Sequence, residues 1–404
     1  MNIAVVGQGY VGLSISIGAA SNGHKVFGID NDAILISKLS RGETHVPNIS
    51  KNILLDLISA DKFKPTTSFQ EIAQCSIVVI AVPTPLSINR EPDLSLLIEA
   101  SYKIAENLTN KCLLINESTS HPGTLRNVIK PIIEAGSKLT HFYAAAPERI
   151  DPGNDVWNLK NTPRIIGGIT EEAGNLAEHF YKSFCLNVLR VSSPEVAEAA
   201  KLFENTFRQI NIALANEFSI ISDKIGFSSS EAIKAASTKP FGFMSFYPSI
   251  GVGGHCIPVD PTYLGYAAKQ VGVEANFIDL ANSINSKMVD YVVTKIKSKI
   301  ETEMSRLRIQ VAGIAYKPGV SDLRESPALN LISELRKEGA KVIWHDPLVK
   351  SWNSEKSSEL STSIDLGLIV TPHKVIDFSV WKNKELRVLD LSANAEDYGW
   401  SKFL

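Results

Sequence analysis

The chain has 404 residues, of which 44% are hydrophobic and 21% are charged, and its formal net charge at pH 7 is -2. This composition supplies enough apolar side chains for a globular core, and the length favours two or three domains. The charges nearly balance, the basic residues form no dense run, and the apolar runs are far shorter than the ~20 residues that span a bilayer, so we expect neither nucleic-acid nor membrane binding.

The first part of the sequence alternates between apolar strands and helices. A helix is expected at residues 11–22, and strands are expected at residues 2–6, 25–29, 77–82, 112–116 and 165–168. Near-continuous apolar strands are typical of a parallel sheet that helices cover on both faces. The pattern therefore predicts a doubly wound α/β domain over residues 1–193.

The pattern changes to a helical one after Pro194. Apolar residues recur at helical spacing from Val196 to Leu214, in a stretch that contains no glycine or proline before Gly226. One long helix is expected there, followed by helices at residues 229–237 and 277–296. Residues 194–300 are therefore predicted to form a helical middle domain.

A second alternating region begins near residue 308. Strands are expected at residues 308–314, 341–344, 366–370 and 386–391, with a helix at residues 328–338. The predicted fold class is thus α/β, with two Rossmann-like doubly wound domains joined by a helical middle domain with a long central helix. The second α/β domain is expected over residues 301–404.

The first predicted strand leads into Gly7-Gln8-Gly9-Tyr10-Val11-Gly12, a G-x-G-x-x-G pattern at the start of a helix. Such glycines let the backbone approach a pyrophosphate held at the helix N-terminus. Asp30, at the end of the second strand, could accept hydrogen bonds from a ribose diol and would repel a 2′-phosphate, which favours NAD over NADP. The alternatives are a structural glycine turn and a solvated acid at a strand end.

Cys256 stands in a loop whose composition is unlike that of a core strand. It follows the closely spaced glycines of residues 251–254 and precedes Asp260 by four residues. A thiolate beside freely approachable backbone is suited to attack an aldehyde, although a lone cysteine can also be a packing residue. The other cysteines lie beside apolar segments and the eight histidines are scattered, so no metal site is expected.

Lys201 and Asn205 lie one helical turn apart on the long middle helix and therefore share a face. Both are polar residues among apolar neighbours in residues 200–207, a segment too apolar for a simply solvated surface. A cation near the Cys256 thiol would favour the thiolate and would stabilise oxyanions formed during aldehyde oxidation.

Four separated motifs resemble those of the UDP-glucose/GDP-mannose dehydrogenase family. They are the amino-terminal glycine loop, the lysine-to-asparagine helix, the cysteine loop of residues 253–260 and the segment Lys317-Pro318 to Ser326-Pro327, and they match in order over about residues 1–350. The resemblance implies an NAD-binding domain at 1–193, a dimerisation domain with the cysteine loop at 194–300 and a UDP-binding domain at 301–404. It also implies a homodimer or higher homo-oligomer that serves polysaccharide biosynthesis. Residues 1–6 enter the glycine loop without the charged and cleavable regions of a secretory signal, so we expect a cytoplasmic protein.

The resemblance also assigns roles to single residues. Cys256 is implied as the nucleophile, Lys201 and Asn205 as oxyanion stabilisers, Thr119 and Asp260 as positioners of water, and Glu148 as an acid/base candidate. The cofactor contacts implied besides the glycine loop and Asp30 are Pro83, Thr84 and Thr119. The substrate contacts implied are Glu148, Arg149, Lys201, Asn205, Lys239, Phe243, Gly253, Tyr316, Lys317 and Arg324.

Within the family, several segments look like the branch that acts on UDP-N-acetylglucosamine. They are residues 89–93, 117–119, 147–149, 238–243 and 255–258. Two positions depart from the UDP-glucose members, since Pro152 replaces a glutamate and Val259 replaces a lysine. Ser321 replaces an aspartate common in the family, and the arginine that reaches a neighbouring subunit's sugar has no clear match near Lys239-Pro240. UDP-N-acetylglucosamine is therefore the expected substrate, with UDP-N-acetylmannosamine, UDP-N-acetylgalactosamine and UDP-glucose as alternatives.

The expected reaction is a two-step oxidation of the sugar's 6-hydroxymethyl group to a carboxylate. The aldehyde would be captured by Cys256 as a thiohemiacetal, oxidised to a thioester and released by water. Two other functions fit part of the sequence: a single-step hydroxy-acid or polyol dehydrogenase, which needs no cysteine loop, and a non-catalytic NAD-binding module. The first would form one NADH for each substrate and the second would form none.

Overall fold

The computed structural model describes residues 1–46, 49–151, 154, 156–254, 256–382, 386–393 and 398–404. The chain divides into two compact units. The first unit comprises Met1–Glu204 with Thr262–Val273, and the second comprises Asn205–Pro261 with Glu274–Leu404. No helix among the described residues is long and apolar enough to cross a membrane.

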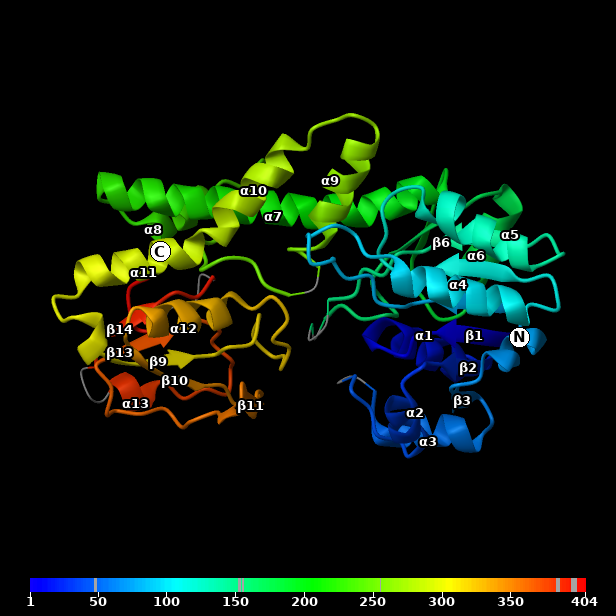
Figure 1. Cartoon of the computed structure of the whole chain (residues 1–404), viewed down its shortest axis with the longest axis horizontal. Helices are drawn as coiled ribbons and strands as arrows, with labels where there is room; N and C mark the ends of the chain where they lie inside the picture. The colour runs from blue at the N-terminus through cyan, green and yellow to red at the C-terminus, as the bar shows by residue number, and fades with distance from the viewer. Residues whose placement is uncertain (47–48, 152–153, 155, 255, 383–385, 394–397) are drawn as a thin grey trace. The chain divides into compact units, whose positions relative to one another are not determined.

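The first unit contains an eight-stranded sheet of order β3-β2-β1-β4-β5-β6-β7-β8 (Figure 1). Its strands are β1 (Asn2–Val6), β2 (Lys25–Ile29), β3 (Phe63–Thr66), β4 (Ile77–Ile80), β5 (Leu113–Asn116), β6 (Phe142–Ala145), β7 (Arg164–Gly168) and β8 (Val188–Val191). Neighbours pair in parallel except β6 and β7, where Ala144 lies opposite Gly168 in an antiparallel ladder. This pair departs from the expected parallel sheet. The strand order reverses between the adjacent strands β1 and β4, because the chain runs outward from β1 to β3 and then returns to form β4. This is the usual place for a dinucleotide in a doubly wound fold.

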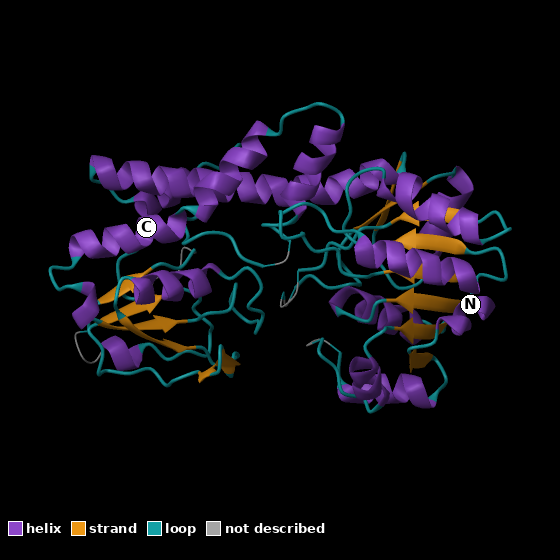
Figure 2. Ribbon diagram, in the orientation of Figure 1, coloured by secondary structure: helices purple, strands orange, loops and turns teal. Residues whose placement is uncertain are grey.

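Helices cover both faces of this sheet (Figure 2). Helices α1 (Tyr10–Ser21), α2 (Ala33–Ser40), α3 (Lys51–Ser59) and α6 (Glu171–Lys182) pack on the face that carries Ile3 and Val5. Helices α4 (Ser95–Asn107) and α5 (Lys130–Gly136), with the short turns η1 (Phe69–Gln74) and η2 (Leu125–Ile129), pack on the face that carries Ala4 and Val6. The alternation of strand side chains thus creates two apolar cores.

The second unit contains a fully parallel sheet of order β10-β9-β13-β14. Its strands are β9 (Arg308–Ala312), β10 (Lys341–His345), β13 (Leu366–Ile369) and β14 (Val388–Asp390), and a separate hairpin joins β11 (Ser351–Trp352) to β12 (Glu355–Lys356). Helices α11 (Met288–Lys299) and α12 (Pro327–Lys337) contribute to one apolar core, and α13 (Ser379–Lys382) contributes Trp381 to another. The carboxyl ends of the four strands share one edge, as ligand-binding α/β sheets require.

Helix α7 (Pro194–Ile225) is the long helix that the periodicity predicts, and it ends before Gly226. Helices α8 (Ser229–Ala236), α9 (Asp260–Gln270) and α10 (Asn276–Ser286) follow. The single helix expected at residues 277–296 is wrong, because Lys287 separates α10 from α11. The break lets Asn285 of α10 accept a 2.9 Å hydrogen bond from Asn216 of α7, while the apolar side chains of α11 join the sheet core.

Candidate functional site

In the first unit, the loop between β1 and α1 has backbone geometry that only glycine permits. Gly7 has φ +91°, and a Cβ there would lie 2.4 Å from the Ala81 carbonyl oxygen. A Cβ at Gly12 would lie 1.7 Å from the Gly7 oxygen, whereas a Cβ at Gly9 would meet nothing within 4 Å. Gly9 also precedes α1 without a side-chain cap. Open backbone at the N-terminus of a helix fits the pyrophosphate of a dinucleotide.

The Asp30 carboxylate is fixed at the end of β2. Its Oδ2 accepts a 2.7 Å hydrogen bond from the Gln8 backbone N–H, and its Oδ1 accepts one of 2.9 Å from the Asp32 N–H. Each oxygen retains a further lone pair for a ribose hydroxyl. The Gln8 side chain is buried and donates to the Val5 carbonyl at 2.8 Å, so it connects the glycine loop to β1. The structure therefore brings Asp30 and the glycine loop together.

Further predicted residues follow the carboxyl ends of the neighbouring strands. Pro83 and Thr84 follow β4, and the Thr84 carbonyl accepts a 3.1 Å hydrogen bond from Tyr263 on α9. Thr119 follows β5, and its hydroxyl accepts a 2.6 Å hydrogen bond from Lys201 Nζ on α7. The structure therefore brings the predicted residues Thr119 and Lys201 together, and the expected effect of Lys201 on the thiol stays a prediction.

Glu198, one turn before Lys201 on α7, holds the loop that carries Thr119. Its Oε2 accepts a 2.7 Å hydrogen bond from the Gly123 N–H, and its Oε1 accepts one of 3.0 Å from the Leu125 N–H. The side chain is buried. Glu198 thus fixes the register between this loop and α7, and only its three-residue spacing from Lys201 could have suggested this from the sequence.

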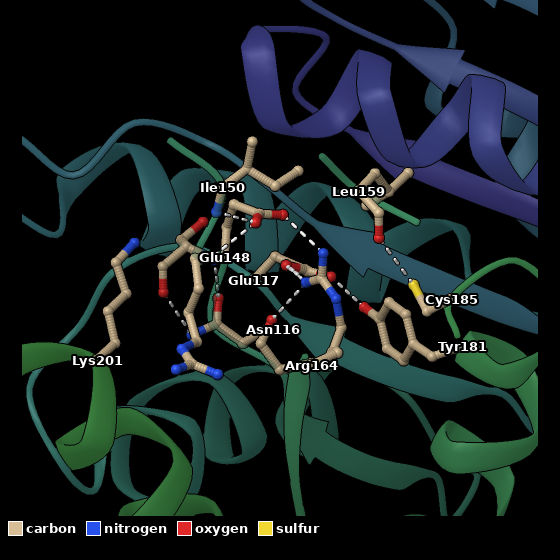
Figure 3. A network of polar contacts seen from close by, with 12 residues as sticks. Asn116, Glu117, Glu148, Ile150, Leu159, Arg164, Tyr181, Cys185 and Lys201 are labelled. Atoms are coloured by element: carbon tan, nitrogen blue, oxygen red, sulfur yellow. Dashed lines mark hydrogen bonds and ion pairs between the residues drawn. The ribbon is translucent and has the colours of Figure 1, made fainter. Parts of the chain in front are cut away.

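Glu148, after β6, lies in a buried polar network (Figure 3). Its Oε2 accepts a 2.7 Å hydrogen bond from Arg164 Nη2, and its Oε1 accepts bonds of 2.6 Å from the N–H groups of Arg149 and Ile150. Burial would raise the pKa of Glu148, but Arg164, these hydrogen bonds and the charge of Lys201 outweigh it and lower the pKa. The carboxylate is therefore held ionised, with both oxygens engaged.

Arg164 bridges Glu148 to a second buried carboxylate. Its Nη1 donates to Glu117 Oε2 at 2.5 Å, and Tyr181 of α6 donates its hydroxyl to the other oxygen of Glu117. The Arg164 guanidinium carbon lies 4.9 Å from the centroid of the Tyr181 ring (Figure 3). One guanidinium thus faces two carboxylates, and Arg149 beside them forms a separate pair with Glu204 of α7 at 2.5 Å.

Glu117 gives this network a pH dependence. Burial raises the pKa of Glu117 to about 7 from an ordinary value of 4.5, although the charge of Arg164 opposes the shift. A carboxyl group whose pKa is raised by folding stabilises the fold below pH 4.5, and that contribution is lost as the pH rises through 7. Over this range the free energy of unfolding of the wild type should fall, relative to Glu117→Gln, by up to about 1.4 kcal/mol per pH unit. Urea denaturation of both proteins measures this difference, and identical pH profiles would contradict the prediction.

In the second unit, Cys256 is exposed and follows a glycine loop whose shape is set by Tyr316. A Cβ at Gly254, which has φ +88°, would lie 2.7 Å from the Tyr316 ring, and one at Gly253 would lie 2.9 Å from the Tyr316 Cβ. The Gly254 N–H donates to the Arg324 carbonyl at 3.0 Å. The two motifs, separated by about 60 residues of sequence, are therefore packed together.

Asn205 and Asp260 are also paired in this unit. Asn205 Nδ2 donates to Asp260 Oδ2 at 2.6 Å, and the Asp260 N–H donates to the Cys256 carbonyl at 2.8 Å. Asp260 is 1% exposed, whereas the thiol-bearing residue is exposed. The structure therefore brings Asn205, Asp260 and the Cys256 backbone together.

The segment after β9 contains the predicted substrate residues of this unit. The Arg324 side chain donates to Asp322, with Nη2 to Oδ2 at 2.6 Å, and Lys317 Nζ lies 5.8 Å from the centroid of the Tyr316 ring. The hydrogen bonds that Arg324 donates to Asp322 are the main cause of the raised pKa of Arg324, and the nearby Cys256 contributes a smaller electrostatic effect. Arg324 is thus a cation close to the cysteine loop.

Two predicted substrate residues lie elsewhere. Lys239 and Phe243 are in the exposed segment after α8, where Lys239 Nζ lies 4.9 Å from the centroid of the Phe241 ring. His255 and Pro152, which the sequence comparison used, lie outside the described residues. Within the residues that the structure describes, no three His, Cys, Asp or Glu side chains gather as a metal site would need.

Comparisons with known protein families match three successive parts of the chain. The NAD binding domain of the UDP-glucose/GDP-mannose dehydrogenase family matches residues 1–185, the family's central domain matches residues 195–287, and its UDP binding domain matches residues 310–391.

Individual relatives cover most of the chain. The UDP-N-acetyl-D-mannosamine dehydrogenase of Pyrococcus horikoshii is 36% identical over 391 residues, which cover 95% of this chain and 92% of that protein. The UDP-N-acetyl-D-glucosamine 6-dehydrogenase of Pseudomonas aeruginosa is 33% identical over 359 residues, which cover 87% of this chain and 84% of that protein. The solved structure of the UDP-D-ManNAc dehydrogenase from Pyrococcus horikoshii superposes with a TM-score of 0.87 at 34% identity, covering 98% of this chain and 96% of that one.

Proposed function

Because the chain belongs to the UDP-glucose/GDP-mannose dehydrogenase family, we propose that it oxidises the 6-hydroxymethyl group of a UDP-N-acetylhexosamine to the uronate. Family membership confirms the expected fold class, NAD as the cofactor, and the expectation of an NAD-dependent enzyme of the UDP-sugar 6-dehydrogenase kind. The observation that carries the two-step reaction is the exposed Cys256 in a glycine loop packed against Tyr316.

The sugar epimer that we propose differs from the one expected from the sequence motifs. The relative named for UDP-N-acetyl-D-mannosamine is 36% identical, and the one named for UDP-N-acetyl-D-glucosamine is 33% identical. We therefore place UDP-N-acetylmannosamine first and UDP-N-acetylglucosamine second, which reverses the order argued from sequence motifs. A role in polysaccharide biosynthesis, the three-domain division and a homodimeric assembly are parts of the same proposal.

The chemistry assigned to this chain centres on the Cys256 sulfur. NAD, when bound by the glycine loop and Asp30, accepts the hydride equivalents that the oxidation removes. Cys256 attacks the carbon of the aldehyde to form a thiohemiacetal, which retains the hydrogen that must leave next. Oxidation gives a thioester, and water cleaves it to release the uronate and return the thiol.

The side chains around these groups take positioning roles. Asn205, held by Asp260, and Lys201, bonded to Thr119, are proposed to stabilise the developing oxyanion and to orient water. Glu148 was expected as an acid/base candidate. Its lowered pKa and its fully engaged oxygens favour a fixed negative charge near Lys201 instead.

The test is the yield of NADH with a panel of UDP-sugars. We expect the purified protein to form two NADH per UDP-N-acetylmannosamine, with slower turnover of UDP-N-acetylglucosamine, UDP-N-acetylgalactosamine and UDP-glucose. One NADH per substrate would support the single-step alternative. No turnover of any UDP-sugar, with intact NAD binding, would support a non-catalytic module.

Asp30 is expected to set the cofactor preference. Asp30→Asn should raise the Kd for NAD about 10-fold and narrow the preference over NADP, because a charge-assisted hydrogen bond to the ribose is replaced by a neutral one. The matched control is Asp32→Asn, since Asp32 caps α2 by accepting from the Ile34 N–H and asparagine caps equally well. Calorimetric titration with both cofactors measures the effect. Equal losses of NAD affinity in Asp30→Asn and Asp32→Asn would contradict a specific role for Asp30.

A further inference from the structure

His373 lies in the second unit, between two loops at the carboxyl edge of the four-stranded sheet. It follows β13 in the turn Thr371-Pro372-His373, and its side chain is 1% exposed. Its Nδ1 accepts a 3.1 Å hydrogen bond from the Gly319 backbone N–H, and its Nε2 lies 3.0 Å from Asp346 Oδ2. Since Nδ1 is an acceptor, the neutral imidazole carries its proton on Nε2 and donates it to Asp346.

Asp346, which follows β10, holds the backbone at residues 314–315, directly before the turn that contains Gly319. Its Oδ2 also accepts from the backbone N–H groups of Ile314 and Ala315, at 2.9 and 3.1 Å. Burial would raise the pKa of Asp346, but the His373 hydrogen bond and these backbone donors outweigh it and lower the pKa. One ionised, buried carboxylate therefore holds the backbone at residues 314–315 directly.

The exposed turn of residues 316–319 is consequently tied down at both ends. The Thr371 hydroxyl donates to the Ala315 carbonyl at 2.7 Å before the turn, and His373 accepts from Gly319 at its far end. Lys317 lies within this turn. Because a lysine is a flexible point charge, the position of its ammonium group depends on the backbone that carries it.

We propose that His373 is a positioning residue that preorganises the turn of residues 316–319 for the diphosphate of the nucleotide sugar. The inference rests on the proposed function, in which this segment binds UDP. A turn that is already ordered loses less conformational entropy when it closes on its ligand. His373 lies too deep to touch a ligand itself, and it acts through the Gly319 amide and Asp346.

The experiment compares His373→Leu with the wild type, using UDP and uridine as calorimetric probes. His373→Leu should raise the Kd for UDP about 10-fold while the Kd for uridine changes little, because the fixed turn faces the phosphates. His373→Gln, which carries one donor and one acceptor, should recover part of the affinity. In turnover, KM for the UDP-sugar should rise while kcat and NAD binding stay near wild-type values.

His345→Leu is the matched control, because His345 Nδ1 bonds the Ser358 carbonyl at 2.7 Å, on β10 and outside the turn. The role of His373 is overturned if His373→Leu binds UDP as tightly as the wild type, or if its affinities for UDP and uridine fall equally. It is also overturned if His345→Leu loses UDP affinity to the same extent as His373→Leu. If His373→Leu does not fold, the UDP affinity of His373→Gln, expected between wild type and a 10-fold loss, decides the question. A wild-type protein that binds no UDP would instead overturn the proposed function.

Discussion

Cys256→Ala is expected to lower kcat by about 10³-fold or more, with the yield of NADH per sugar falling from two toward one. The mutation removes the atom that would capture the aldehyde, so the second oxidation loses its covalent intermediate. NAD and UDP affinities should remain near those of the wild type, because Cys256 is exposed and the substitution removes a single sulfur atom. Steady-state turnover, end-point NADH and calorimetric titration with NAD and UDP measure the three expectations.

The matched control is Cys75→Ala. Burial raises the pKa of the Cys75 thiol to about 12, so this cysteine stays protonated and cannot act as a nucleophile at neutral pH. Cys75→Ala should leave kcat unchanged. It should lower the free energy of unfolding only slightly, because it removes one buried sulfur atom. A Cys256→Ala enzyme that still forms two NADH per sugar at the wild-type rate would exclude the thioester mechanism.

The sequence predicted those features that depend on local backbone requirements. The glycine loop and Asp30 follow from a strand, a turn and a helix that are consecutive in the chain, and α7 follows from an apolar period sustained over many residues. The break at Lys287 was missed because the apolar pattern continues through it. Asn285, two residues before the break, bonds Asn216 of α7, a contact that the local sequence does not contain.

The candidate site shows the same division between local and distant causes. The spacing of the glycines singled out the loop of Cys256, but the close neighbours that exclude a Cβ there are distant in sequence. They are the Tyr316 ring at Gly254, and Tyr316 Cβ, Glu325 and Pro327 at Gly253. The network around Arg164 was not predicted, because Glu117, Glu148 and Tyr181 come from three separate segments. Its one sequence signal is an arginine at the start of an apolar strand.

Arg164 is the residue whose loss should destabilise the fold most. Arg164→Leu is expected to lower the free energy of unfolding at pH 7 by about 3–5 kcal/mol, because the buried carboxylates of Glu117 and Glu148 would lose the guanidinium that bonds both. Arg164→Lys should be intermediate, since one ammonium cannot reproduce the separate bonds from Nη1 and Nη2. Urea denaturation measures both variants.

The control for Arg164 is Arg149→Leu, which breaks the more exposed pair with Glu204 and should cost no more than about 1 kcal/mol. The loss caused by Arg164→Leu should also shrink as the pH falls, because unpaired buried carboxylates take up protons more readily than paired ones. The two variants could instead lose equal free energies of unfolding, or the loss in Arg164→Leu could be independent of pH. Either result would mean that packing and not charge pairing makes Arg164 important. The pH dependence separates these causes because leucine fills part of the arginine's volume but carries no charge at any pH.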